Sequence, residues 1–185
     1  MSVDRSPGGL IGLVAMGVVI AAPARAAAPI ELQAKLFFKI ATYDENLPAE
    51  VLNVGVAYPS ATAAAPIVKA FRDLENMKVN GRRIQTIDIP YKVPADIAAA
   101  ATKSPIYGLF VTAAATEADV RAIRDLAKKL GAFTFAQDER HVASGLTAGV
   151  AVEGDKRIIV LNMAAAIEQG RKYDGNFLKA CKIMR

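Results

Sequence analysis

The sequence lacks tryptophan altogether, and its 185 residues include one cysteine and one histidine. The single cysteine, Cys181, excludes an internal disulfide and a zinc site built from several cysteines. The single histidine, His141, excludes a multi-histidine metal centre. Aromatic residues make up only 6% of the chain, and the lone cysteine does not fit a small disulfide-stapled scaffold. These absences exclude the commonest metal-dependent and disulfide-dependent classes of protein.

Motifs of catalysis and nucleotide binding are missing as well. The sequence contains no G-x-G-x-x-G, no P-loop and no G-x-S-x-G elbow. Cys181 lies among apolar residues of a predicted helix, which is typical of a buried, unreactive thiol rather than a nucleophile. His141 has no partner motif and is predicted to be an ordinary loop residue. We therefore expect a non-catalytic protein with no cofactor.

Charge and hydropathy favour one compact domain. The formal net charge is +5 and 53% of the residues are hydrophobic, enough for one sizeable core. Basic residues near the C-terminus, Arg171 and Lys172 among them, have no interleaved aromatics, so we predict a solvated face and no nucleic-acid partner.

The N-terminal segment, residues 1–26, has the pattern of a signal peptide. An apolar run from Leu10 to Ala22 is followed by an A-x-A cleavage site, Ala24-Arg25-Ala26. The alternative is a retained membrane anchor, but the run is shorter than the roughly 20 residues that span a bilayer. We expect residues 27–185 to form a single α/β domain in the periplasm.

Helical and strand patterns alternate along this domain. Apolar spacing predicts helices over 29–43, 63–77, 94–102, 116–130, 163–168 and 176–184, and strands over 51–57, 84–89, 106–111 and 133–136. Two further extended runs, 146–153 and 156–161, meet at Gly154-Asp155 and predict a β-hairpin. The order predicts a single-domain α/β sandwich with a mostly parallel sheet, extended by a C-terminal antiparallel hairpin.

Four residues after the first predicted helix are the candidate partner-binding site. Tyr43, Asp44, Glu45 and Asn46 combine an aromatic anchor with charge, as contact hot spots often do. Such an acidic cluster could also bind a cation. In the alternative interpretation, Tyr43 belongs to the core and the polar residues bond the backbone of a helix-ending turn. Tyr107, inside a predicted strand, is expected in the core.

Several segments together resemble the YfiR-like family of periplasmic proteins. The first is the opening helix with its exit, LQAKLFFKIATYDENLP, and the second is MKVNGRRIQTIDI around the second predicted strand. The third is the hairpin GLTAGVAVEGDKRIIVLN, followed by the terminal segment FLKACKI. The resemblance covers about residues 30–184, nearly the whole predicted domain.

This resemblance implies a one-domain α/β fold and a regulatory function without catalytic residues. The best-known member of the family represses a membrane-bound diguanylate cyclase through the periplasmic sensor domain of that enzyme, which lowers cyclic di-GMP and biofilm formation. Two features of this chain depart from the family. Asn46-Leu47-Pro48 stands where a Trp-Pro pair is common, and a single cysteine cannot support redox control by an internal disulfide.

Two functional hypotheses follow. The first is a periplasmic regulatory protein that binds a membrane sensor protein, such as the periplasmic domain of a diguanylate cyclase. A homodimer of this chain is also compatible with the sequence. The alternative is a periplasmic small-ligand-binding accessory of an outer-membrane receptor or sensor kinase. Its ligand would occupy the crevice at the carboxyl ends of the strands, formed by loops 57–61, 90–93 and 112–116.

The export prediction has a direct test. Because the A-x-A site ends at Ala26, N-terminal sequencing of protein purified from cells should begin near Ala27. A cytosolic product that begins at Met1 would contradict both export and the periplasmic functions.

Overall fold

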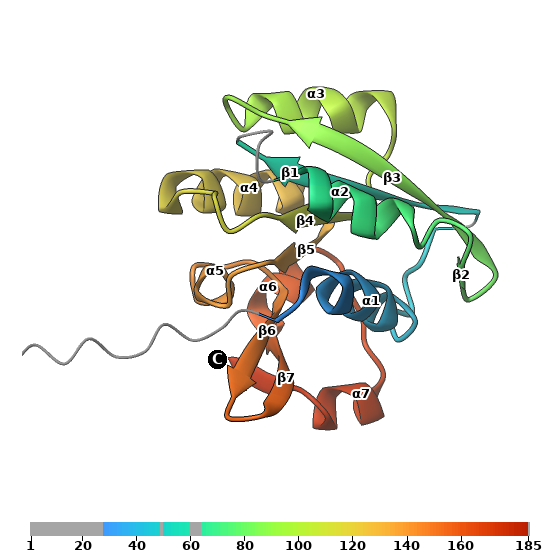
Figure 1. Ribbon diagram of the computed structural model, residues 1–185, viewed down its shortest axis with the longest axis vertical. Coiled ribbons are helices and arrows are strands. Elements are labelled where there is room, and N and C mark those ends of the chain that lie inside the picture. Colours follow the sequence, from blue (N-terminus) through green and yellow to red (C-terminus); the bar gives the residue numbers. More distant parts are fainter. Residues whose placement is uncertain (1–27, 49, 60–63, 185) are drawn as a thin grey trace, which may run out of the picture.

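The computed structural model describes residues 28–184, except 49 and 60–63 (Figure 1). The predicted signal peptide, residues 1–26, lies outside the described residues and stays a prediction. Within the described ranges, no helix has both the length and the apolarity needed to cross a membrane. The strands are β1 (Val51–Tyr58), β2 (Lys78–Val79), β3 (Arg82–Pro90), β4 (Gly108–Val111), β5 (Phe133–Ala136), β6 (Ala148–Glu153), β7 (Lys156–Asn162) and β8 (Lys182–Met184). The helices are α1 (Ile30–Ala41), α2 (Ala65–Arg72), α3 (Ala95–Lys103), α4 (Glu117–Leu130), α5 (Arg140–Ala143), α6 (Met163–Glu168) and α7 (Gly175–Lys179).

All of these strands join one sheet in the order β2-β3-β1-β4-β5-β6-β7-β8 (Figure 1). The five strands from β3 to β6 in this order run parallel to one another. β7 is antiparallel to β6, and β2 is antiparallel to β3. The predicted α/β fold, with a mostly parallel sheet and a C-terminal antiparallel hairpin, is therefore confirmed.

The two edges of the sheet differ from the prediction. β6 belongs to the parallel part, so the hairpin contributes only one antiparallel strand, and the edge itself is the unpredicted β8. At the other edge, β2 exists because Asn80 and Gly81 both adopt positive φ angles, 48° and 84°, and close a two-residue hairpin. A strand of two or three residues is too short to show an alternating pattern in the sequence.

The predicted terminal helix, 176–184, is wrong in its second half. The Asp174 carboxylate accepts hydrogen bonds from the N–H groups of Asn176 and Phe177 and so begins α7. The helix ends at Lys179, and β8 then pairs with β7. Cys181 lies between them, half-buried, and burial raises the pKa of its thiol to about 11. This shift disfavours the reactive thiolate.

Helix ends mostly follow the sequence signals. Thr116 and Asp119 form a reciprocal capping box at the start of α4, and the Asn162 side chain caps α6. α2 is shorter than predicted and ends at Arg72, so that Met77 is 51% exposed rather than part of its buried stripe.

Hydrophobic residues fill both faces of the sheet. α1 and α2 pack on one face, and α3 and α4 pack on the other. At the centre of the first face, the ring of Phe37 lies 5.2 to 5.9 Å from four other phenylalanine rings, those of Phe38, Phe71, Phe133 and Phe135. Each such pair adds about 0.5–1.5 kcal/mol to the free energy of burial. α1 is thus held over the middle of the sheet, which determines where the chain leaves it.

Close contact between α1 and the sheet depends on Gly108. A methyl group at this position would lie 2.7 Å from Cζ of Phe37 and 3.3 Å from the carbonyl oxygen of Phe133. We therefore expect Gly108→Ala to lower the free energy of unfolding by about 1–3 kcal/mol in urea titrations. The control is Gly175→Ala, because a methyl group there would have no neighbour within 4 Å. Equal stabilities of the two variants would contradict this packing.

Candidate binding site at the end of α1

The chain leaves α1 through a turn of residues 42–48, which we call the exit turn. It holds the four predicted site residues, and the structure sends their side chains in different directions. Asp44 is buried, with 4% of its surface exposed, and Tyr43 is half-buried. Glu45 and Asn46 are exposed. The structure therefore does not support treating the four residues as one surface.

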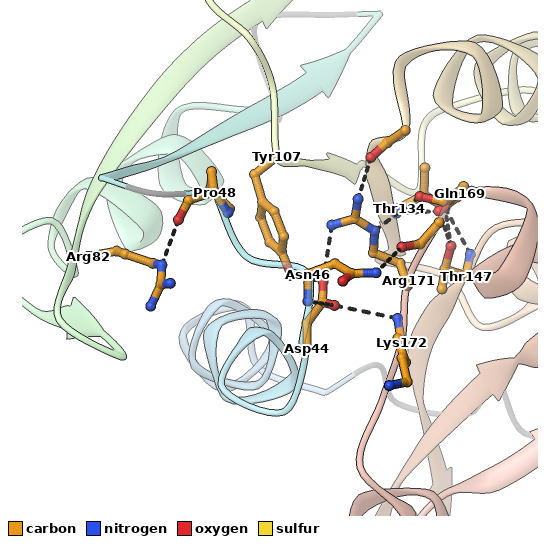
Figure 2. Close-up of polar contacts among 12 residues, drawn as sticks. Asp44, Asn46, Pro48, Arg82, Tyr107, Thr134, Thr147, Gln169, Arg171 and Lys172 are labelled. Carbon is orange, nitrogen blue, oxygen red and sulfur yellow. Dashed lines mark hydrogen bonds and ion pairs between the residues drawn. The ribbon is translucent and has the colours of Figure 1, made fainter.

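The carboxylate of Asp44 points into the protein (Figure 2). Its Oδ2 accepts hydrogen bonds from the Tyr107 hydroxyl and from Nη1 of Arg171, both at 3.0 Å. Its Oδ1 accepts the backbone N–H of Asn46 at 2.9 Å. This corrects the expected exposure of Asp44: the ion pair with Arg171 holds the carboxylate inside, where it cannot contact a partner or an external cation.

Arg171 is also inside, although the sequence placed it on a solvated basic face. Its side chain is only 10% exposed. Nη2 donates to the carbonyl oxygen of Gly131 at 2.7 Å and Nε donates to that of Gln169 at 3.1 Å. The guanidinium also lies over the Tyr107 ring, 5.3 Å from its centroid. Burial, together with the charge of Asp44, raises the pKa of the Tyr107 hydroxyl well above its ordinary value, so this hydroxyl stays a donor.

A second buried polar cluster supports the segment that carries Arg171. The Gln169 side chain accepts hydrogen bonds from the Thr134 backbone N–H and the Thr147 hydroxyl (Figure 2). Its amide nitrogen donates to the Thr134 hydroxyl at 3.2 Å. These three side chains have 1% exposure or less. The cluster joins β5, the start of β6 and the end of α6, and so fixes the backbone that leads to Arg171.

Three side chains hold the exit turn from its other sides. Asn46 donates to the Gly170 carbonyl oxygen at 2.8 Å, and Asn80 donates to that of Thr42 at 3.0 Å. Nε of Arg82 donates to the Pro48 carbonyl oxygen at 2.6 Å. Asn80 and Arg82 belong to the β2–β3 hairpin, which the sequence analysis did not connect to this site. The NG turn was the one signal that could have indicated it.

The outward part of the exit turn is small and lies between two open grooves. Glu45 pairs with Lys172 at 2.5 Å in an exposed ion pair. Tyr43 stacks on Phe177 at 4.8 Å and is partly used in packing. One groove, of about 390 Å³, is lined by Thr42, Tyr43, Asp44, Glu45, Leu47, Asn80, Arg82 and Asp174. The other, of about 460 Å³, is lined by Asn46, Leu47, Pro48, Glu50, Val51, Asn53, Pro105, Ile106, Tyr107, Gly131 and Arg171.

The carboxyl ends of the strands form the alternative site. The strand order reverses between β1 and β4: the chain continues from β1 to β3 on one side, and from β4 to β5 on the other. Tyr58 ends β1, and burial together with a hydrogen bond to Asp88 raises the pKa of its hydroxyl to about 12. Tyr91 and Thr112, from two of the predicted loops, are buried. Residues 60 and 61 of the first loop lie outside the described residues.

Two further sequence-based expectations concern metals and His141. His141 belongs to the short helix α5 and not to a loop, and it is 5% exposed. The burial arises because α5 packs against β5 and β7. The described part of the chain contains no group of three or more His, Cys, Asp or Glu side chains that could hold a metal ion.

Comparison with known proteins supports the fold and leaves the family open. No protein-family model matches this chain, and no curated protein matches it. A crystal structure of a conserved domain protein from Vibrio cholerae O1 biovar El Tor has a similar fold, with a TM-score of 0.62 and 13% identity. The match covers 85% of this chain and 60% of that one.

A second solved structure with a similar fold is the ABC domain in complex with L-Trp from Streptococcus pneumonia. Its TM-score is 0.55 and its identity 14%, over 84% of this chain and 61% of that chain. This chain thus spans about three-fifths of the length of each of these two structures. At such identities the likeness establishes an α/β fold shared with a ligand-binding domain and nothing finer.

The ion pair between Asp44 and Arg171 should dominate local stability. Arg171→Met leaves a buried carboxylate without its counter-charge, so we expect the free energy of unfolding to fall by about 3–5 kcal/mol. The matched control is Lys172→Met, which removes an exposed partner of Glu45 and should change the free energy of unfolding far less. Urea titrations measure both. Similar decreases in the free energy of unfolding of the two variants would show that the Asp44–Arg171 ion pair is not a major source of stability.

Proposed function

We propose that this chain is a non-catalytic, exported binding protein that regulates a membrane sensor protein through its exit turn. The observation that carries the proposal is the contrast between the two sides of this turn. Its inner side is fixed by Asp44, Arg171 and Tyr107, and its outer side presents Glu45 and Asn46 between two open grooves. A surface that is already ordered loses little conformational entropy on binding, which favours affinity and specificity.

The shape of the grooves supports a protein partner. Small-molecule sites are usually concave and enclose most of the ligand. The two grooves beside the exit turn are open, and the turn between them exposes one charged and one amide side chain. Tyr43 lines the first groove as a half-buried aromatic residue, a type that often anchors protein interfaces.

The resemblance to the YfiR-like family supplies the finer form of the proposal. In that form the partner is the periplasmic domain of a membrane-bound diguanylate cyclase, and binding lowers cyclic di-GMP and biofilm formation. A regulator of this kind needs no catalytic residue, because it acts by binding one state of its partner better than the other. The polar groups of Asp44, Arg171 and Tyr107 form hydrogen bonds inside the protein, chiefly with one another. We therefore assign them no role in chemistry on a substrate.

A second candidate is a small-ligand-binding accessory of a receptor or sensor kinase. Two observations favour it. The reversal of strand order between β1 and β4 is where open α/β sheets bind ligands, and a structure of similar fold is a complex with L-Trp. Calorimetric titration with L-tryptophan and other amino acids separates the candidates, since only a ligand-binding accessory should give saturable heat.

The exit-turn proposal is tested by Glu45→Lys. The substitution breaks an exposed ion pair and should change the thermal midpoint little, but it reverses a charge at the proposed interface. We expect weaker binding to the partner and, if the partner is a diguanylate cyclase, raised cyclic di-GMP in a deletion strain complemented with the variant.

Asp125→Lys is the matched control, because it makes the same charge change on an exposed residue of α4, on the other face of the sheet. A folded Glu45→Lys protein that restores wild-type cyclic di-GMP, as the control should, would remove the exit turn from consideration. The Asp44→Lys change is unsuitable for this purpose because it places a cation beside buried Arg171.

A further inference from the structure

The outer edge of β3 is open over most of its length. β2 pairs only with Arg82 and Arg83, at the beginning of the strand. From Ile84 to Pro90, no other strand of the described residues lies on that side of β3. Exposed backbone donors and acceptors on a sheet edge are a template for an additional strand. Native sheets cover or block such edges unless the edge is used.

The backbone of β3 alternates its hydrogen-bonding direction. The N–H of Arg83 donates toward β1, to the carbonyl oxygen of Glu50, so the odd-numbered residues face β1. The backbone groups of Thr86 and Asp88 therefore point to the open side. One of them has a substitute partner: the N–H of Thr86 donates to the carboxylate of Glu75 at 2.7 Å.

Grooves flank this edge on both faces of the sheet. On the α2 face, a groove of about 450 Å³ lies between Tyr58, α2 and Asp88. On the α3 face, a groove of about 440 Å³ follows Ile87 to Pro90 and is bordered by α3. In Figure 1, β3 and α3 lie together at the β2 end of the sheet, with α2 in front of the strands. The β3 edge is thus the floor of a slot between two helices.

The walls of the slot differ in chemistry. On the α2 side, Lys69 pairs with Asp73 at 2.5 Å and Arg72 approaches Asp88 at 3.8 Å, so the charges cancel. On the α3 side the wall is mixed: Ile87, Ala99 and Ala100 are apolar, whereas Asp88 and Asp96 carry charge. Lys103 stands at the end of that wall, exposed, and no carboxylate of the described chain pairs with it. The slot therefore offers small apolar side chains and one lysine without an ion-pair partner among the described residues, in a wall that also holds two aspartates.

We propose that the slot binds an extended segment of another protein, which adds to the sheet as a strand beside β3. Main-chain hydrogen bonds would form with the outward groups of Thr86 and Asp88. Because side chains of a strand alternate between faces, every second residue of the segment enters the α3 groove, and the residues between them enter the α2 groove. The α3 wall leaves room for small side chains against Ala99 and Ala100, and Lys103 favours one acidic side chain beside it.

Glu75 has a defined role in this proposal. Its carboxylate occupies the N–H of Thr86 and must move aside when a strand is added. It therefore blocks random pairing of the edge, as charged residues do on many exposed edges. Glu75 makes entry selective for segments whose side-chain contacts offset the loss of this hydrogen bond. The slot is separate from the exit turn, and this inference does not depend on the function proposed there.

The test uses the full chain and a synthetic nine-residue peptide, blocked at both ends, in which valine alternates with threonine and one valine is replaced by glutamate. Amide hydrogen exchange followed by NMR reports on Thr86 and Asp88. With saturating peptide, we expect exchange at both amides to slow at least tenfold. Glu75→Ala should strengthen peptide binding several-fold, and Lys103→Glu should weaken it about tenfold. Lys179→Glu, the same change on α7 at the other end of the sheet, should leave binding unchanged (Figure 1).

A second peptide, N-methylated at every peptide nitrogen, keeps the side chains but cannot pair as a strand, because its methyl groups remove its main-chain donors and clash with the backbone of β3. Equal protection of the two amides by this peptide would overturn strand addition, as would no protection at millimolar concentrations of the first peptide. Sedimentation at increasing protein concentration identifies a third outcome. A dimer that protects the same amides without peptide would assign the edge to a second copy of this chain and overturn the proposal of a foreign segment.

Discussion

A buried ion pair organises this protein around the point where its first helix ends. Asp44 and Arg171 are both inside, and each costs several kcal/mol to remove from water, so the pair persists only because its remaining hydrogen-bonding capacity is used. Tyr107 and the carbonyl oxygens of Gly131 and Gln169 supply those bonds. As a result, the exit of α1, the start of β4 and the chain after α6 meet at one place and cannot move independently.

This constraint explains why the outer surface of the exit turn is well defined. A turn is usually among the more mobile parts of a fold, because few buried contacts hold it. Here its carbonyl oxygens are bound by Asn80 and Arg82 from the β2–β3 hairpin, and its inner carboxylate by Arg171. The exposed Glu45 and Asn46 are therefore carried on a rigid support. The same hairpin that clamps the exit turn also begins β3, whose open edge forms the slot between α2 and α3.

The three surfaces lie at separate places on one sheet, and each follows from its topology. The exit turn lies at the amino ends of the central strands, beside Tyr107 just before β4. The reversal of strand order lies between β1 and β4, and the candidate ligand site is at the carboxyl ends of these two strands. The open edge exists because β2 is only two residues long and β3 extends far beyond it. One sheet thus brings an exposed turn, a reversal of strand order and an open edge to three separate places.

The sequence by itself determined the alternation of helices and strands, because buried parallel strands are continuous apolar runs and helix caps are local: Thr116 with Asp119 and Asn162 act within three residues of themselves. It could not predict β2 and β8, which are too short for any periodicity and exist only through pairing with β3 and β7. Nor could it predict the burial of Asp44. In the sequence, Asp44 belongs to a polar cluster of four residues that suits an exposed turn as well as a buried one. Only the fold brings Arg171, 127 positions later, to 3.0 Å from the Asp44 carboxylate. A charge is buried or exposed according to whether a counter-charge reaches it, and that is decided by tertiary structure.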